Sequence, residues 1–228
     1  MKVVPLGMVK VLYLNKGKNV RVEAFAMQET PVIISDFLRF VQINPGWTKS
    51  QIVRPIFGDT TYLADWRSDY EPDSKTLSNA PITQVSWFAA RAYCQWLGLK
   101  LPTIKQWERA AQGRLNGSSP TKTILSWYSR STLNRLPPVS SGIKNEWGII
   151  ALHGMIREWT EDFNSVFIAG ESRGAESLDK NQFCGLGAEG AGNKNDYAAF
   201  MRFAFRASLK ANYATKDLGF RCVKEGAI

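Results

Sequence analysis

The stretch that decides the fold, Pro81–Gly113, reads PITQVSWFAARAYCQWLGLKLPTIKQWERAAQG and predicts two short helices joined by a tight corner. Ser86 is a favoured N-cap for the first helix, and Gly98 is typical of the residue that ends one. Thr103 and Gln106 have the spacing of a capping box, which predicts the start of the second helix. These signals are local, so both helices are expected whatever surrounds them.

Apolar spacing predicts which helix faces are buried. The apolar positions of the first helix are Ala89, Ala92, Tyr93, Trp96 and Leu97, and those of the second are Ile104, Trp107 and Ala111. The tryptophans of these helices, together with one further along the chain, are expected in the core: Trp87, Trp96, Trp107 and Trp159.

Composition indicates a globular protein. The 228 residues are 44% hydrophobic and 12% aromatic, which is enough for a self-sufficient core, and we expect one domain over residues 1–228. The formal net charge is +9, but lysines and arginines are scattered among acids, so we expect no nucleic-acid binding. No apolar run is long enough to span a membrane or to form a signal peptide, and the sequence does not tell whether a signal was removed.

The rest of the chain predicts an irregular mixture of helices and strands. We expect a strand over 20–27, a helix over 36–43 capped by Ser35, a long surface excursion over 47–80, a short apolar segment over 124–128, a loop over 170–195 and paired strands over 200–223.

Two further blocks accompany the helix pair: GIIALHGMIREW at residues 148–159 and GFRC at residues 219–222. In order and spacing, the three blocks resemble the formylglycine-generating-enzyme family, the sulfatase-modifying-factor domain, over residues 20–224. The resemblance implies an irregular, loop-rich α+β fold related to C-type lectins.

The resemblance also identifies the positions of the founding chemistry. In formylglycine-generating enzymes, two cysteines bind copper and oxidise a substrate cysteine, roughly nine and four residues before an arginine that here resembles Arg206. Tyr197 and Arg202 stand there instead, and neither supplies the thiolate that Cu(I) prefers. We therefore expect no formylglycine-generating activity.

Three functions remain open on this basis. Without the two cysteines, the chain resembles the nitrite-reductase accessory branch of the family. This resemblance implies a binding or maturation factor for a partner copper or respiratory enzyme. The alternatives are a metal- or oxygen-dependent oxidase similar to the pyoverdine-maturation branch, and a lectin-like binding module. His153 is the sole histidine, which excludes multi-histidine metal sites, and we expect it to be structural.

Metal binding is expected at one position, if at all. In the family, the glutamate that Glu158 resembles helps to bind calcium, but Met155 and Arg157 replace neighbouring asparagine and tryptophan. Calcium is therefore possible at Glu158. Alternatively, Arg157 pairs with that carboxylate and takes the place of the ion, or the carboxylate is a structural hydrogen-bond acceptor.

The cysteines carry two further expectations. The resemblance implies a disulfide between Cys94 and Cys222, hence a periplasmic or otherwise extracytoplasmic location. Alternatively, both cysteines are small buried hydrophobic residues. Cys184 is the odd thiol: either a soft ligand that makes copper possible, or an inert buried residue.

The candidate binding site follows from the same region. Cys184, Tyr197, Arg202 and Arg206 are predicted to line a recognition groove for a protein or peptide partner or an anionic group. Alternatively, the aromatic and basic residues of 196–206 form an ordinary core strand.

Overall fold

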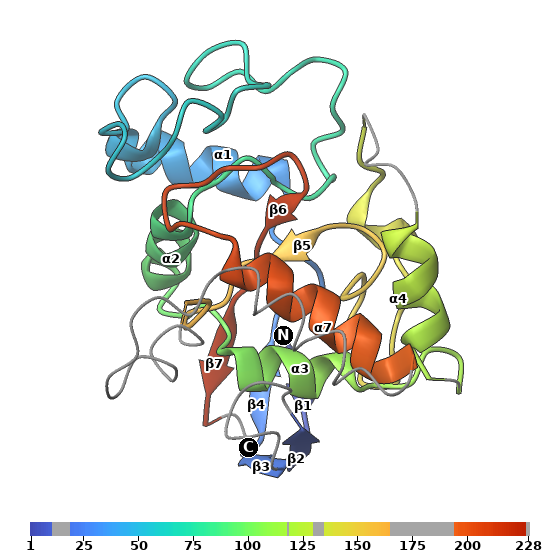
Figure 1. Ribbon diagram of the computed structural model, residues 1–228. Coiled ribbons are helices and arrows are strands. Elements are labelled where there is room, and N and C mark those ends of the chain that lie inside the picture. The colour runs from blue at the N-terminus through green and yellow to red at the C-terminus, as the bar shows by residue number, and fades with distance from the viewer. Residues whose placement is uncertain (11–18, 118, 130–134, 165–193, 227–228) are drawn as a thin grey trace, which may run out of the picture.

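The computed structural model describes residues 1–10, 19–117, 119–129, 135–164 and 194–226. Of Tyr128 and of residues 194–198, only the backbone is described. An antiparallel sheet of order β1-β4-β7 joins the two ends of the chain (Figure 1). Its strands are β1 (Lys2–Val4), β4 (Phe25–Met27) and β7 (Val223–Glu225).

Two strand pairs complete the sheet structure. β2 (Gly7–Lys10) pairs antiparallel with β3 (Asn19–Val22), while β5 (Arg157–Glu158) pairs parallel with β6 (Leu218–Gly219). Because Glu158 lies opposite Gly219 in the second pair, the blocks 148–159 and 219–222 are adjacent in space.

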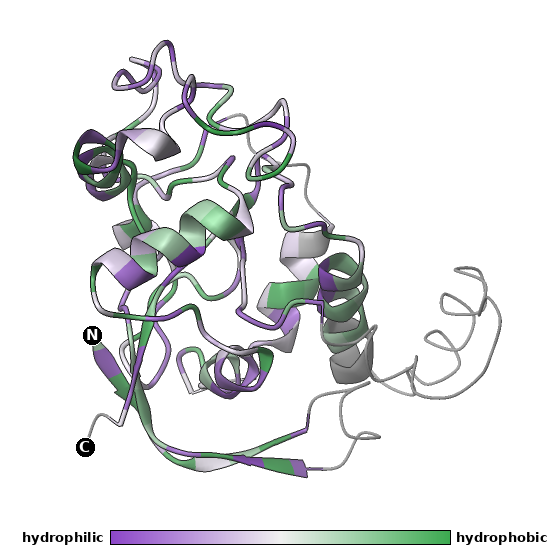
Figure 2. Cartoon of the chain, turned by 90° about the vertical axis from the view of Figure 1, so that its left-hand side faces the viewer, coloured by the Kyte–Doolittle hydropathy of each residue, from purple (hydrophilic) through white to green (hydrophobic). Residues whose placement is uncertain are grey.

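Helices surround these strands (Figure 1). The α-helices are α1 (Ile34–Ile43), α2 (Trp87–Trp96), α3 (Ile104–Ala111), α4 (Thr121–Tyr128) and α7 (Lys194–Ala207), and the 3₁₀ helices are η2 (Pro45–Trp47) and η3 (Val139–Ser141). α3 packs on β2 and β3, and α4 packs on α7. Hydrophobic and hydrophilic residues alternate along the ribbons in Figure 2, as expected for elements that bury one face. The expected irregular α+β class is confirmed.

The local signals of the helix pair are confirmed. The Ser86 hydroxyl accepts the Ala89 N–H at 3.2 Å, and Gly98 follows α2 with a φ of +67°. Thr103 and Gln106 form both halves of the capping box at the start of α3.

The buried face of α2 differs from the expected one. Ala89, Ala90, Tyr93 and Cys94 are buried, whereas Trp96 is 39% exposed, so its expected core position is wrong. Cys94 faces the last strand, and a helix turns by about 200° over two residues, which places Trp96 at the edge of the core, where its ring still contacts those of Phe40 and Tyr93. The same packing leaves Leu97 exposed. Trp107 and Trp159 are in the core as expected, and Trp87 is half-buried.

The 47–80 segment is more than a surface excursion. Tyr62, Leu63 and Trp66 belong to the main core cluster, and the Tyr62 hydroxyl donates to the Trp47 carbonyl at 2.8 Å. Irregular polar sequence hides such anchors, because they follow neither the helical nor the strand period.

Local boundaries also differ. Residues 20–27 form parts of two strands, β3 and β4; α1 begins at Ile34, without a side-chain cap from Ser35; and 124–128 is the second half of α4.

The expected strands over 200–223 are wrong in their first part, which is helix α7. No glycine or proline interrupts residues 194–207. Alternation of aromatic and basic residues suggested a strand, yet Phe203 and Arg206 are also three apart and share one buried helical face.

Candidate functional site

The candidate site lies where α7 packs against α3. Glu108, on α3, accepts two charged hydrogen bonds from Arg202, at 3.1 Å from Nε and 2.7 Å from Nη2. Arg206, one turn further along α7, donates to the same carboxylate from Nη1 at 2.7 Å. One acid on α3 therefore holds two guanidinium groups of α7 in place.

Electrostatics keep this carboxylate ionised. Burial alone would raise the pKa of Glu108. The charges and hydrogen bonds of Arg202 and Arg206 outweigh burial and lower this pKa to about 2. Glu108 therefore stays charged across the neutral range, and the two arginines remain paired with it.

Two hollows flank Arg202. The first, which we call the α7 groove, is lined by Trp107, Trp127, Ile156, Arg157, Glu158, Arg202, Phe205 and Arg206. The second, the α3–α4 hollow, has a volume of about 300 Å³ and is lined by Glu108, Ala111, Gln112, Ser119, Pro120, Thr121, Ile124 and Arg202. Because Arg202 lines both, it is the residue that a ligand in either hollow would meet.

Aromatic rings hold the guanidinium groups of the α7 groove. Arg206 lies 4.8 Å from the Trp107 ring centre, and Arg157 lies 4.4 Å from that of Phe205. Cation–π contacts of this kind orient arginine without using all of its N–H donors. The groove thus presents oriented forks, which suit carboxylate or carbonyl oxygens.

Glu158 lies at the edge of the α7 groove, with its side chain fully buried. Arg221 donates to its carboxylate from Nη2 at 2.8 Å and from Nε at 3.0 Å, and Trp107 Nε1 donates at 2.8 Å. The expected partner Arg157 is wrong; it pairs with Asp217 instead. Arg157 is next to Glu158 in the sequence, whereas Arg221 lies 63 positions away. The parallel β5–β6 pairing, which sets Glu158 opposite Gly219, brings Arg221 close to the carboxylate.

These contacts do not fit calcium. Calcium requires several oxygen ligands around one point, whereas Glu158 is surrounded by the N–H donors of Arg221 and Trp107. The guanidinium already supplies the positive charge that the carboxylate needs.

The contacts of His153 are those of a structural residue. It is buried, its Nε2 lies 3.1 Å from the Ala111 carbonyl, and its ring meets Trp107 edge to face. Burial, and then the charge of Arg202, lowers its pKa to about 4, so the ring is neutral near pH 7. With Nε2–H donating to Ala111, Nδ1 is a buried acceptor that has no hydrogen-bond partner among the described residues.

The expected disulfide is confirmed. Cys94 and Cys222 are bonded, with Cα atoms 5.6 Å apart. Cys184 lies outside the described residues, and of Tyr197 only the backbone, within α7, is described. Of the four predicted binding residues, the structure therefore brings Arg202 and Arg206 together and does not place the other two.

Copper has no fitting site in the described part of the chain. Both described cysteines are consumed by the disulfide, and Arg202, at one expected thiol position, is a cation paired with Glu108. Nor do the described residues gather three histidine, cysteine or acidic side chains around one point.

Fold and site together define a protein of the formylglycine-generating-enzyme-like class. The family model of the sulfatase-modifying factor enzyme 1-like domain matches residues 3–226, and the chain belongs to that family.

Named relatives include a formylglycine-generating enzyme and a protein named as an inactive one. The "inactive C-alpha-formylglycine-generating enzyme 2" of Bos taurus is 27% identical, over 90% of this chain and 78% of its own. The "formylglycine-generating enzyme" of Mus musculus is 29% identical, over 71% of this chain and 49% of its own. The solved structure of PvdO from Pseudomonas aeruginosa covers 98% of this chain and 93% of its own with a TM-score of 0.56, and at 16% identity it shows likeness of fold.

Sequence reasoning missed two residues of the site. Glu108, which anchors α7, sits in the quoted helix pair, where its position beside Trp107 gave no sign of its partners. Trp127 was assigned only to a short apolar segment. A helical interpretation of 194–207 would have placed Arg202 and Arg206 on one face and indicated an acidic partner.

Proposed function

We propose that this protein is a non-catalytic member of its family that binds a partner polypeptide at the α7 groove and the α3–α4 hollow. One observation carries the proposal: at an expected thiol position stands Arg202, which is held by Glu108 and lines both hollows. The family framework is retained, and its chemistry there is recognition of oxygen atoms instead of oxidation of sulfur.

The charges favour a partner segment that contains a carboxylate. Arg157, Arg202 and Arg206 place three guanidinium groups along the α7 groove, where Asp217 and Glu108 hold them in position. Oriented guanidinium groups with aromatic rings beside them suit an acidic side chain or a chain terminus. A maturation or accessory role toward a copper or respiratory enzyme is the finer form of this proposal.

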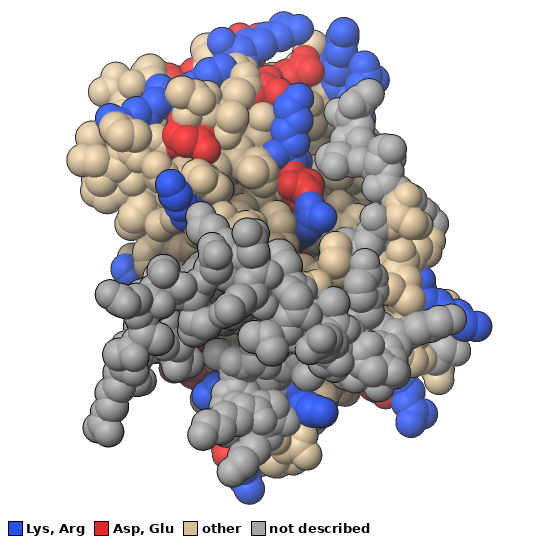
Figure 3. Space-filling view, viewed as in Figure 1, with Lys and Arg blue, Asp and Glu red and all other residues tan. Residues whose placement is uncertain are grey.

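Charge is not concentrated on the described part of the face that Figure 3 shows. Lys and Arg are spread there with acids among them. Within the described ranges, no helix has the length and apolarity to cross a bilayer. The Cys94–Cys222 disulfide supports an oxidising, extracytoplasmic location.

Selection of a random displayed peptide library on the immobilised protein tests the proposal. We expect enrichment of peptides with an acidic residue or a free carboxyl terminus. The Kd of the best peptide is then measured by calorimetry. Arg202→Ala should weaken it about tenfold, because a hydrogen bond between charged groups is lost. The variant should stay folded, since Arg206 still pairs with Glu108.

Arg91→Ala is the matched control. Arg91 also pairs with a carboxylate, that of Glu161, but lines neither hollow. Its loss should leave the peptide Kd unchanged. Failure to enrich any peptide, or equal affinity of the best peptide for the Arg202 variant and the unchanged protein, would refute the proposal.

A further inference from the structure

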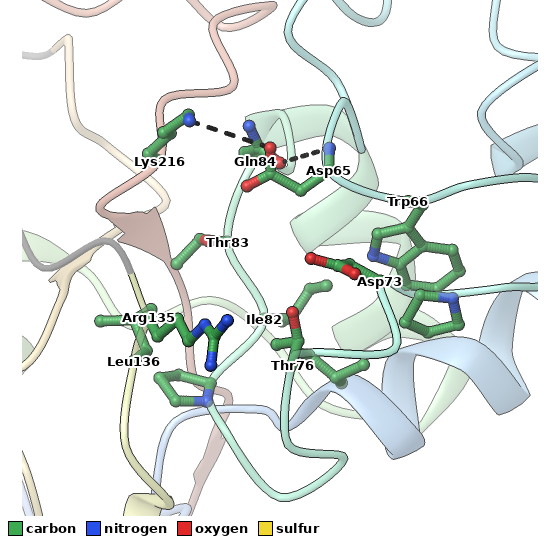
Figure 4. Close-up of a pocket in the computed structure, with 13 residues that line it drawn as sticks. Asp65, Trp66, Asp73, Thr76, Ile82, Thr83, Gln84, Arg135, Leu136 and Lys216 are labelled. Atoms are coloured by element: carbon green, nitrogen blue, oxygen red, sulfur yellow. Dashed lines mark hydrogen bonds and ion pairs between the residues drawn. The ribbon is translucent and has the colours of Figure 1, made fainter.

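A third cleft lies in another part of the molecule and shares no residue with the α7 groove or the α3–α4 hollow. It is lined by Ile34, Asp65, Trp66, Pro72, Asp73, Thr76, Pro81, Ile82, Thr83, Gln84, Arg135, Leu136 and Lys216, and we call it the polar cleft (Figure 4). Nothing in the proposed function uses it.

The polar cleft carries both signs of charge. In Figure 4, Asp73 and Arg135 enter from opposite sides, and Lys216 lies near Asp65 at one end. Lys216 and Asp65 are 3.9 Å apart and largely exposed, so their attraction is weak. Neither Asp73 nor Arg135 forms an ion pair with any residue in the described ranges. The cleft thus holds an anion and a cation that form no ion pair with the residues that the structure describes.

A buried amide adds a polar group. Gln84 is only 3% exposed, and its Oε1 accepts the Asp65 N–H at 3.0 Å. Within the described part of the chain, its Nε2 donates no hydrogen bond, and in Figure 4 it lies on the same side as the Lys216 amine. Gln84 Nε2 keeps contact with solvent at the cleft wall, where an oxygen atom of a ligand can accept a hydrogen bond from it.

The backbone beside this amide is strained. Gln84 and Leu63 have φ values of +57° and +48°, and the Leu63 N–H donates to the Gln84 carbonyl at 2.8 Å. Left-handed backbone at residues other than glycine costs about 1 kcal/mol or more each and is concentrated at functional sites. The strain fixes Gln84 at the wall of the cleft.

Size limits what enters. The cavity volume is about 70 Å³, less than half of the roughly 150 Å³ of a cavity that holds benzene. The enclosed part therefore has room for a few heavy atoms, and the remainder of any ligand would extend outward.

We propose that the polar cleft binds the zwitterionic head group of a free α-amino acid. Its carboxylate lies toward Arg135, and its ammonium group lies toward Asp73, which faces Arg135 across the cleft. One small head group then pairs with both side chains, while its own side chain points out of the cleft.

NMR titration with each proteinogenic L-amino acid in turn tests this proposal. The reporters are the Gln84 side-chain amide and the Trp66 indole N–H, both at the cleft. We expect at least one amino acid to shift these signals saturably. Its N-acetyl derivative and its methyl ester, which each lack one charge, should bind about tenfold more weakly or not at all.

Variants locate the binding. Arg135→Gln and Asp73→Asn should each weaken it about tenfold. The matched controls are Lys75→Gln and Glu71→Gln, which make the same charge changes at exposed residues outside the cleft lining and should leave the affinity unchanged. No saturable shift with any amino acid, or equal binding of the N-acetyl and ester forms, would overturn the proposal. Because the two sites share no residue, this result is independent of peptide binding at the α7 groove.

Discussion

Arg221 and Glu158 form an ion pair in which neither side chain is exposed to solvent, with Arg221 Nη2 2.8 Å from Glu158 Oε1. Trp107 of α3 donates to the same carboxylate. All three blocks by which the chain resembles its family, the helix pair, residues 148–159 and residues 219–222, therefore meet at one carboxylate in the core.

Glu158→Gln should destabilise the protein strongly. The substitution leaves the Arg221 charge buried without a counter-ion, which typically costs about 3–5 kcal/mol. Urea denaturation measures the loss as a lower midpoint. Glu161→Gln, which breaks the exposed pair with Arg91, is the control and should cost about 1 kcal/mol or less. A similar loss in both variants would contradict the role assigned to the buried pair.

Reduction of the disulfide should lower stability by a comparable amount. Cys94 and Cys222 are 128 residues apart, and in the chain-entropy model a loop of that length contributes about 5 kcal/mol. The Cys94→Ala/Cys222→Ala double variant should therefore unfold at a much lower denaturant concentration. Thiol titration of the oxidised, unfolded protein should detect Cys184 alone; three free thiols would exclude the bond.

Truncation of tryptophans should separate core positions from surface ones. Trp107 is 4% exposed and hydrogen-bonded to Glu158, so Trp107→Ala should cost about 3–5 kcal/mol. Trp96→Ala should cost roughly half as much. Trp96 is already 39% exposed, so its side chain buries less apolar surface on folding. Thermal melting compares the two, and an equal loss would mean that Trp96 packs more tightly than the structure indicates.

Stability should fall as the pH drops from 6.5 toward 4, partly because of His153. Burial lowers its pKa from 6.5 to about 4, so the unfolded chain takes up this proton first. The neutral form therefore stabilises the fold above pH 6.5. This contribution, at most about 3 kcal/mol, is lost progressively down to pH 4. His153→Gln should flatten this part of a stability–pH curve measured by urea denaturation. An unchanged slope would show that other groups control it.

Formylglycine should not be produced. Arg202 occupies an expected thiol position and is committed to Glu108, so no copper thiolate pair assembles there. Incubation of a sulfatase-type cysteine peptide with the protein, copper and oxygen should yield no aldehyde by mass spectrometry, with an active formylglycine-generating enzyme as the positive control. Aldehyde above the enzyme-free background would mean that the active site lies elsewhere in the chain.

The sequence by itself determined the features that depend on neighbouring residues. Ser86, Gly98 and the Thr103–Gln106 box specify helix ends, because each acts on backbone groups within a few positions. The three sequence blocks likewise sufficed for the family, and with it for the disulfide. Residues 200–206 were misassigned, since a short run of alternating residues satisfies the strand and helix periods alike.

Only the tertiary structure decided which distant groups meet. Glu158 pairs with Arg221, 63 positions away, and Glu108 with Arg202, 94 positions away. Equally charged alternatives stand nearby in the sequence, among them Arg157 next to Glu158. The choice between them depends on how β5, β6, α3 and α7 pack, because packing fixes the distance and direction of each side chain, and no local pattern encodes either. The exposure of Trp96 has the same cause, since the disulfide at Cys94 sets the rotation of α2.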